Sequence, residues 1–295
     1  MTAGGTGEWV LGVIGGSGLY EIEGLTDRET VAVESPWGGP SDALVTGRLD
    51  GVRLVFLPRH GVGHRIPPGS VNARANIDVL KRAGCTDLLS ISAVGSLREE
   101  LAPGAFVVVD QFIDRTVSRP ASFFDNGVVA HVSMADPVCP RLSGFAAAAA
   151  REAGAPTVEG GVYVAVEGPQ FSTRAESELY RSWGASVIGM TAMPEARLAR
   201  EAELPYASVC MVTDYDCWRA ETAHVEVAGV LAMLKSNAET ARDLIGRLVR
   251  ALPDERPASA IDNGLDFAVV TDPALWPPDQ VRKLAAVCPR KFGSG

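Results

Sequence analysis

The stretch DLLSISAVGS (residues 87–96) decides the fold class of this chain. It is apolar for most of its length and ends in small residues, which is typical of a strand buried on both faces. The runs WVLGVIGG (9–16) and YASVCMVT (206–213) have the same character. Since segments with helical patterns lie between such strands, we expect an α/β fold, a single domain with a mixed, largely buried β-sheet flanked by helices.

Glycines and capping signals set the expected limits of the other elements. Gly84 and Gly154 end helical patterns, and Thr173 and Glu176 have capping-box spacing. We expect further strands at 42–49, 52–58, 106–114, 162–168 and 185–190, and helices at 71–83, 143–154, 173–183, 194–202 and 226–250.

The chain changes in composition after Pro253, where it becomes richer in proline and acidic residues. It still carries the apolar pieces FAVV and ALW, so we do not expect it to hang free. We divide the chain into a main domain, residues 1–252, and a C-terminal tail, residues 253–295, docked on that domain or on a neighbouring subunit.

The composition restricts the class of partner and the location. Hydrophobic residues make up 46% and charged residues 21%, as in ordinary soluble proteins. A net charge of −9 argues against binding to nucleic acid or acidic membranes. No apolar stretch could span a bilayer and the first residues lack an export pattern, so we expect a cytoplasmic protein. The five cysteines are scattered without a CxxC, which favours reduced thiols over a zinc site or a disulfide framework.

Polar side chains follow several of the expected strands. Ser17 lies in GGSG (15–18), Arg59 and His60 in PRHGVGH (58–64), Ser92 in SISAVGS (90–96), and Thr191 in GMTAMPE (189–195). An arginine fork, a histidine that could donate, and hydroxyls suit a phosphate-like anion. Because ligands collect at the carboxyl ends of strands in open α/β sheets, we expect these groups to form one oxyanion cage.

Each of these signals has a plainer alternative when taken alone. GGSG lacks the third glycine of a dinucleotide fingerprint and the Gly-Lys of a Walker loop, and a simple tight turn is as good an explanation as anion binding. His60 and His64 are four residues apart, but the glycines between them disfavour a helix and no third ligand is evident, so we expect no metal.

TDYDCW (213–218) places Asp214 and Asp216 just after an apolar strand. They could cap a turn or the helix that follows. They could also bind a metal, but no third acidic cluster supports this. They could also bind adenine, because an ionised carboxylate accepts from the 6-amino group and a protonated one donates to N7. A 6-oxopurine would suit asparagine better, so two aspartates favour a 6-aminopurine. Phe171 in EGPQFSTRAES (167–177) is either a core residue or a ring that stacks on a planar ligand.

From about Val10 to Arg250 the chain resembles the trimeric purine nucleoside phosphorylase family, and within it the enzymes that act on 5′-methylthioadenosine. The resemblance rests on motifs that occur in the same order: VIGGSGL, RHGxxH, VNARANI, GSLREELxPG, DQFIDRT, EGPQFSTRAES, MTAMPE and TDYDCW.

The resemblance implies roles for individual residues. Phosphate would be bound by Ser17, Arg59, His60, Ser92, the backbone at Ala93, and Thr191. The nucleoside would be bound by Met190 at the ribose, Phe171 near the base, and also His64, Asp214, Tyr215 and Asp216, with Asp214 as the proton donor to N7. Ser172 and Val227 would select methylthio nucleosides, and His131 would come from the neighbouring subunit.

The implied reaction is phosphorolysis of 5′-methylthioadenosine to adenine and 5-methylthioribose 1-phosphate. It would need phosphate as co-substrate, no metal or organic cofactor, and a homotrimer with sites at the subunit interfaces. Two alternatives stay open. One is a purine nucleoside phosphorylase that prefers inosine, guanosine or methylthioinosine. The other is a non-catalytic nucleotide-binding module, against which the missing third glycine and the aspartate pair both speak.

Overall fold

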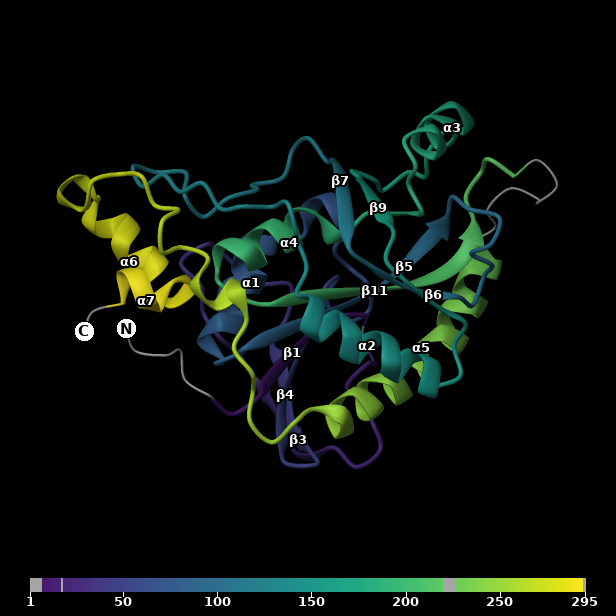
Figure 1. Ribbon diagram of the computed structural model, residues 1–295, viewed down its shortest axis with the longest axis horizontal. Coiled ribbons are helices and arrows are strands. Elements are labelled where there is room, and N and C mark those ends of the chain that lie inside the picture. Colours follow the sequence, from purple (N-terminus) through teal and green to yellow (C-terminus); the bar gives the residue numbers. More distant parts are fainter. Residues whose placement is uncertain (1–6, 17, 220–226, 294–295) are drawn as a thin grey trace.

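The computed structural model describes residues 7–16, 18–219 and 227–293, and at 227–232 and 234 it describes the backbone alone. Within these residues one sheet of eleven strands runs through the molecule, with helices against it (Figure 1). Both parallel and antiparallel strand pairs occur in it. The expected fold class, a mixed and largely buried sheet flanked by helices, is therefore confirmed.

The strand β5 (Asp87–Ser96) organises the sheet because it has three strand partners. On one side it pairs with β11 (Tyr206–Tyr215), and on the other with β1 (Val10–Gly15) and then β10 (Val187–Gly189). The remaining strands extend outward from these: β4 (Val52–Pro58), β3 (Leu44–Leu49) and β2 (Thr26–Val31) beyond β1; β9 (Val162–Val166) and β7 (Gln111–Arg115) beyond β10; β6 (Phe106–Val109) and β8 (Thr157–Glu159) beyond β11.

Three details of the strand prediction were wrong. The expected strand 106–114 is two strands, because the chain changes partners at Asp110, from β11 to β9. The strands β2 and β8 were not expected at all. β2 has the sequence TDRETV and is exposed at every residue, and β8 has three residues, so neither carries an apolar pattern that sequence analysis can detect.

The helices pack on opposite faces of the sheet. Consecutive residues of a strand point to opposite faces, and Leu88 and Leu89 accordingly belong to two different core clusters. The first cluster includes residues of α1 (Ala73–Arg82) and α4 (Ala192–Glu201), and the second includes residues of α2 (Pro140–Glu152) and α5 (Val227–Ala251). This double burial explains why β5 is apolar on both faces.

The helix α3 (Arg174–Ser182) begins at the expected capping box. The Glu176 backbone N–H donates to Thr173 Oγ1 at 3.3 Å, and the Thr173 N–H donates to Glu176 Oε2 at 2.7 Å. In Figure 1 α3 stands at the outer edge of the fold, above β9.

The tail after Pro253 packs on the rest of the chain. Arg256 donates to the buried carboxylate of Asp87, and the helix α6 (Pro278–Val287) lies against α1. Cys288 and Phe292, the latter in α7 (Pro289–Phe292), are buried in the cluster shared with α1. The tail forms a separate lobe beside the loop that follows β7 (Figure 1).

No helix in the described part of the chain is both long and apolar enough to cross a membrane.

Candidate active site

The carboxyl ends of four parallel strands meet at one edge of the sheet. β1 runs parallel to β4 and β5, and β5 runs parallel to β11. Along its other side, β5 pairs with β1 only as far as Ser90 and with β10 only from Gly95. Among the described strands none therefore lies beside 91–94 on that side. The sheet is open there, as at the crevices where α/β proteins bind ligands.

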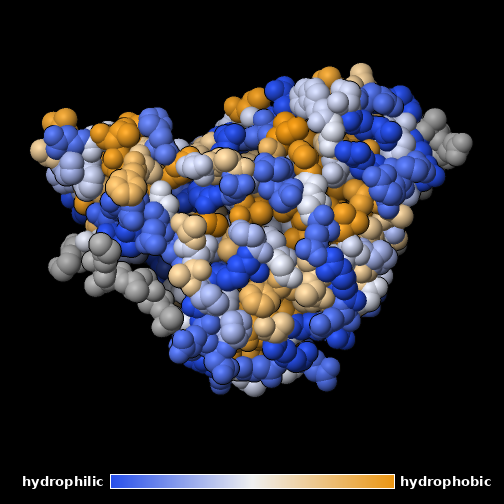
Figure 2. Space-filling model, in the orientation of Figure 1, coloured by the Kyte–Doolittle hydropathy of each residue, from blue (hydrophilic) through white to orange (hydrophobic). Residues whose placement is uncertain are grey.

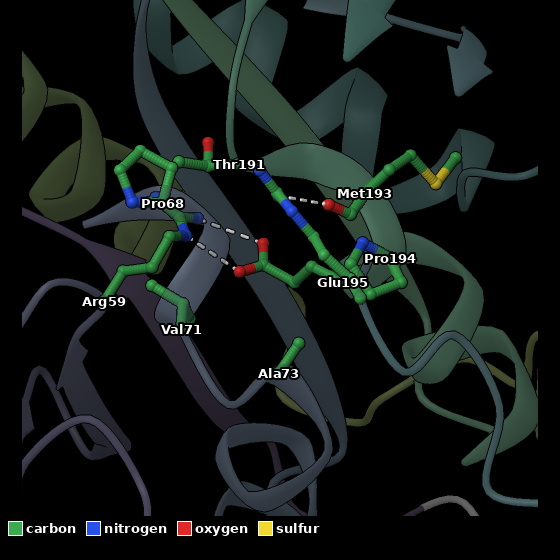
Figure 3. A pocket seen from close by; sticks show the side chains of 9 residues that line it. Arg59, Pro68, Val71, Ala73, Thr191, Met193, Pro194 and Glu195 are labelled. Atoms are coloured by element: carbon green, nitrogen blue, oxygen red, sulfur yellow. Dashed lines mark hydrogen bonds and ion pairs between the residues drawn. The ribbon is translucent and has the colours of Figure 1, made fainter. Parts of the chain in front are cut away.

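Arg59 follows β4 and fills part of this gap. It is 2% exposed, and its Nη1 donates to the Ile91 carbonyl at 3.0 Å while Nη2 donates to Ser90 Oγ at 2.7 Å. Glu195 of α4 accepts from Nε at 2.8 Å and from Nη2 at 3.0 Å (Figure 3). The second Nη1 hydrogen has no acceptor in the described part of the chain, so it is available to an anion.

Two buried hydroxyls near this ion pair are unpaired within the described residues. They are Ser92 Oγ and Thr191 Oγ1. Ser92 lies two residues beyond Ser90 and shares its face of β5, and the half-buried Ala93 follows it. The Thr191 N–H donates to the Tyr163 hydroxyl at 3.3 Å. The Tyr163 hydroxyl and the Cys210 thiol lie near the hydroxyls of Thr191 and Ser92, respectively, but neither contact has the geometry of a hydrogen bond, so both hydroxyls can bind a ligand.

The Arg59–Glu195 ion pair lines a small cavity (Figure 3). It is lined by Arg59, Pro68, Val71, Ala73, Arg119, Thr191, Met193, Pro194 and Glu195. The lining combines two arginines, one carboxylate and one hydroxyl with apolar residues. Ser17, the remaining residue of the expected cage, lies outside the described residues.

His60 and His64 stack on each other in the loop after β4, with ring centroids 4.3 Å apart. His60 Nδ1 lies 2.9 Å from the Ile66 carbonyl, and because a carbonyl only accepts, Nδ1 carries the proton. Burial, together with the charge of Arg59, lowers the pKa of His60 to about 4, although the bond to Ile66 opposes this. The ring is therefore neutral at pH 7 and its Nε2 accepts, whereas the sequence had led us to expect a donor.

Asp214 and Asp216 lie at the end of β11 and are held against Gly95 of β5. An added Cβ at Gly95 would lie 3.1 Å from Ile188 Cγ2, 3.3 Å from Asp216 Cβ and 3.4 Å from Asp214 Oδ2, so a side chain there would require these neighbours to move slightly. Burial raises the pKa of Asp214, and the charge of Asp216 adds to this, while the Thr213 hydroxyl opposes it at 2.7 Å from Oδ1.

Burial also raises the pKa of Asp216, although the nearby Ser177 hydroxyl and Cys217 N–H oppose this. Its buried Oδ2 has no partner within hydrogen-bonding distance in the described part of the chain. The two carboxyls therefore take up a proton more readily than an exposed aspartate. A carboxyl that holds a proton can donate, and its ionised neighbour can accept, which are the two tasks that a 6-aminopurine edge requires.

The arginine and hydroxyl groups around Ser92 and the two carboxylates are close enough to contact one small molecule. Asp214 pairs with Gly95, three residues beyond Ser92 on β5. At about 3.3 Å per residue this spacing is about 10 Å, which is the scale of a nucleoside. The structure thus places Ser92 and Asp214, one residue from each of the two expected groups, near each other on neighbouring strands.

The loop that carries Phe171 lies beside the aspartates. Cys217 Sγ donates to the Ser172 carbonyl at 3.2 Å, which ties this loop to the end of β11. Phe171 is 55% exposed, so it is not a core residue. Met190 is half-buried against Gly168, where an added Cβ would lie 2.4 Å from the methionine sulfur.

Two other expected residues, Tyr215 and His131, are not brought into this cluster. The Tyr215 hydroxyl donates to the Glu99 carbonyl at 3.2 Å, because alternate residues of a strand face opposite ways. His131 is exposed, and its N–H donates to the Ala268 carbonyl of the tail at 2.8 Å. The side chain of Val227, at the start of α5, lies outside the described residues.

Sequence reasoning missed Glu195, Arg119 and Glu167. Glu195 and Glu167 stand inside the motifs MTAMPE and EGPQF, which were singled out for other residues. Arg119 follows DQFIDRT by three positions. A sequence does not show whether a charged residue is buried and paired or exposed to solvent, and most charged residues are exposed.

No group of three or more histidine, cysteine, aspartate or glutamate side chains in the described residues is arranged to hold a metal ion.

A known class of enzymes has this fold, in which the sheet is open beside β5. The chain belongs to the phosphorylase superfamily, whose family model matches residues 10–252. It is similar to the S-methyl-5′-thioadenosine phosphorylases of Cereibacter sphaeroides and Geobacter sulfurreducens. The first is 57% identical over 283 residues, which cover 95% of this chain and 98% of that protein. The second is 54% identical over 278 residues, which cover 94% of this chain and 97% of that protein.

Solved structures give the same picture. A methylthioadenosine phosphorylase from an antarctic soil metagenomic library is 44% identical, with a TM-score of 0.90, and 96% of this chain and 99% of that chain are covered. The methylthioadenosine phosphorylase of Schistosoma mansoni in complex with adenine is 40% identical, with a TM-score of 0.76 and coverage of 82% and 91%. The family resemblance expected from the sequence motifs is confirmed.

The neutral His60 predicts an acid-sensitive loop. Its pKa is lowered from 6.5 to about 4, so the stability that neutral His60 contributes is complete above about pH 6.5 and is lost as the pH falls toward 4. His60→Asn keeps a donor for Ile66 and removes the titration. Between about pH 7.5 and 4.5 the wild type should lose about 2 kcal/mol more unfolding free energy than this variant, after allowance for partial exposure.

Urea unfolding at both pH values measures this difference. His131→Asn, which removes an exposed histidine from another loop, is the control. An equal loss in wild type and His60→Asn would mean that His60 is not held neutral.

Proposed function

We propose that this protein is a pentosyltransferase that cleaves 5′-methylthioadenosine with phosphate, giving adenine and 5-methylthioribose 1-phosphate. The observation that carries the proposal is the proximity, along β5, of the Ser92 hydroxyl to two aspartates of raised pKa, the half-buried Asp214 and the buried Asp216. The products would feed purine and methionine salvage.

The aspartates supply the acid that departure of the base requires. As the bond from C1′ to N9 breaks, negative charge develops on the adenine ring. Asp214, whose pKa burial raises, gives its proton to N7, while Asp216 accepts from the 6-amino group. A proton on N7 lets adenine leave as a neutral molecule, and the exposed Phe171 lies in the loop beside it to cover the base.

The phosphate side supplies the nucleophile. A phosphate oxygen forms the new bond to C1′, and its negative charge stabilises the cationic ribosyl ring. We assign phosphate binding to Ser17, Arg59, His60, Ser92, the backbone at Ala93, and Thr191. The two unpaired hydroxyls and the free Nη1 hydrogen of Arg59 support this.

The neutral state of His60 refines its role. With Nδ1–H bound to Ile66, the Nε2 lone pair accepts the hydrogen of a monohydrogen phosphate. Such an acceptor leaves the remaining phosphate oxygens to the donors of the cage. Among these, Arg59 is charge-compensated by Glu195, so hydroxyl and backbone donors carry a larger share of phosphate recognition than they would beside an unpaired arginine.

The 5′ side is assigned to apolar and neighbouring groups. Met190 lies against the ribose, and Ser172 and Val227 favour a thioether over a hydroxyl, since valine offers a hydroxyl no hydrogen-bond partner. We also assign nucleoside binding to His64 and to His131 of a neighbouring subunit, but not to Tyr215, whose hydroxyl donates to the Glu99 carbonyl. No metal or organic cofactor takes part in this scheme.

We propose that the protein is cytoplasmic and that it forms a homotrimer. All five cysteines are free thiols, as is usual in a reducing compartment. For assembly, Phe267 in the tail is 98% exposed and Val117 is 84% exposed, and Val129, Val270 and Leu275 are exposed as well. Apolar residues gather on the tail lobe (Figure 2). Such a surface supports an interface here, and the backbone N–H of His131 donates to Ala268 in the same region.

The function is tested with wild-type protein and a substrate panel. Adenine should be released from 5′-methylthioadenosine only when phosphate is present, and faster than the bases of adenosine, methylthioinosine and inosine. Release that does not depend on phosphate would make the protein a nucleosidase. Preference for inosine or methylthioinosine would make it another kind of purine nucleoside phosphorylase. Nucleotide binding without turnover would leave only the non-catalytic module.

Replacement of the proposed acid should act selectively on the aminopurine. Asp214→Asn should lower kcat for 5′-methylthioadenosine by about 100-fold, the usual effect of losing a general acid. It should lower kcat for methylthioinosine much less, because an amide can donate to a 6-oxo base. Asp243→Asn, an exposed carboxylate on α5, is the control. Equal losses on both substrates would remove the base-reading role from Asp214.

The trimer is tested by sedimentation. Wild-type protein should sediment with three times the mass of one chain, and Phe267→Asp should shift it toward monomer by placing a charge in an apolar interface. A monomer at all concentrations would contradict both the trimer and the assignment of His131.

A further inference from the structure

We propose that Arg119 is a positioning residue for this reaction, holding the segment that carries Thr191 and the loop that carries Phe171 in fixed relation. The proposal rests on the proposed function, in which Thr191 faces phosphate and Phe171 faces the base.

The contacts of Arg119 use the whole guanidinium group. Nη1 donates to the carbonyls of Met190 at 2.7 Å and Met193 at 2.8 Å. Nη2 donates to the carbonyls of Glu167 at 2.7 Å and Val166 at 3.4 Å, and Nε donates to Glu167 Oε1 at 2.9 Å. All five N–H donors are therefore occupied, and the side chain is 5% exposed.

The two Nη1 bonds fix the phosphate side. The Met190 carbonyl belongs to the peptide unit whose N–H is that of Thr191, so this bond sets the orientation of that peptide. The Met193 carbonyl lies two residues before Glu195, the partner of Arg59. Arg119 thus holds both ends of the turn that presents one hydroxyl to the cage and one carboxylate to its arginine.

The Nη2 bonds fix the base side. Val166 ends β9, and Glu167 begins the loop that leads to Phe171 and Ser172. The carboxylate of Glu167 in turn accepts from the N–H groups of Val117 at 2.7 Å and Ser118 at 3.3 Å, which hold the segment of Arg119 itself. The ring of bonds is closed, so neither loop can shift without breaking several of them.

Only arginine can make the five side-chain hydrogen bonds found at position 119. Lysine has three donors on one nitrogen and cannot reach four carbonyls and a carboxylate spread around a planar fork. Arg119 also lines the cavity together with Arg59 and Thr191, so it lies next to the proposed phosphate-binding residues.

The test compares Arg119→Ala and Arg119→Lys with Arg98→Ala. Arg98 is the matched control, because it also donates to two carbonyls, of Ala185 at 3.1 Å and Gly184 at 2.8 Å, but lies in no part of the proposed site. Arg119→Ala should lower kcat/KM by about 100-fold, the scale of a misplacement of about 1 Å, with higher KM for both phosphate and nucleoside. Arg119→Lys should recover little of this loss.

Guanidinium chloride at non-denaturing concentrations should restore activity of Arg119→Ala by about 10-fold, since the small cation replaces the lost fork, and should leave Arg98→Ala unchanged. If Arg119→Ala does not fold, Arg119→Lys and Glu167→Gln carry the test through the same rise in both KM values. Unchanged KM values per folded molecule, or equal rescue of Arg98→Ala, would overturn the proposal.

Phosphate binding separates this inference from the proposed function. Phosphate should raise the Tm of the wild type and raise that of Arg119→Ala less. If the wild type shows this shift but cleaves no nucleoside, the proposed reaction fails while the positioning role stands. If both proteins show the same shift, the positioning role fails whatever the wild type catalyses.

Discussion

The structure depends on the position of β5 between three strands and two layers of helices. A strand buried on both faces has no water for its polar groups, so each must find a partner or mark a binding site. Ser90 is paired by Arg59, whereas Ser92 is left unpaired in the described part of the chain. The change of partner from β1 to β10 opens the sheet at this point, and the buried Arg59 fills part of the gap.

Two arginine–carboxylate pairs hold the loops around this opening. Arg59 and Glu195 are each 3% exposed at the side chain, and Arg119 with Glu167 joins two loops. Burial of such charges costs about as much as their attraction returns, so buried pairs are a weak source of stability. Their value here is geometric, because forked hydrogen bonds fix both the position and the orientation of the backbone they contact.

The aspartate pair shows how the same burial alters chemistry. Partial or full burial of the Asp214 and Asp216 side chains raises the pKa of both carboxyls. Gly95, which has no side chain, leaves room for both beside β5. A carboxyl that binds a proton more readily can act as an acid toward a leaving base. Burial has the opposite effect on His60, whose pKa falls to about 4, because removal from water disfavours the charged form of either kind of side chain.

The sequence by itself determined the α/β class, most strands and helices, the capping box of α3, and the polar residues at the strand ends, because periodicity and local hydrogen bonding are encoded within short segments. It did not show that 106–114 divides between two partners or that β2 is a strand, since pairing depends on distant segments. Nor did it show that Arg59, Glu195 and Arg119 are buried and paired, that Tyr215 turns away, or that His60 accepts. Only the tertiary structure decided these points, because burial and pKa are set by whatever the rest of the chain packs around each group.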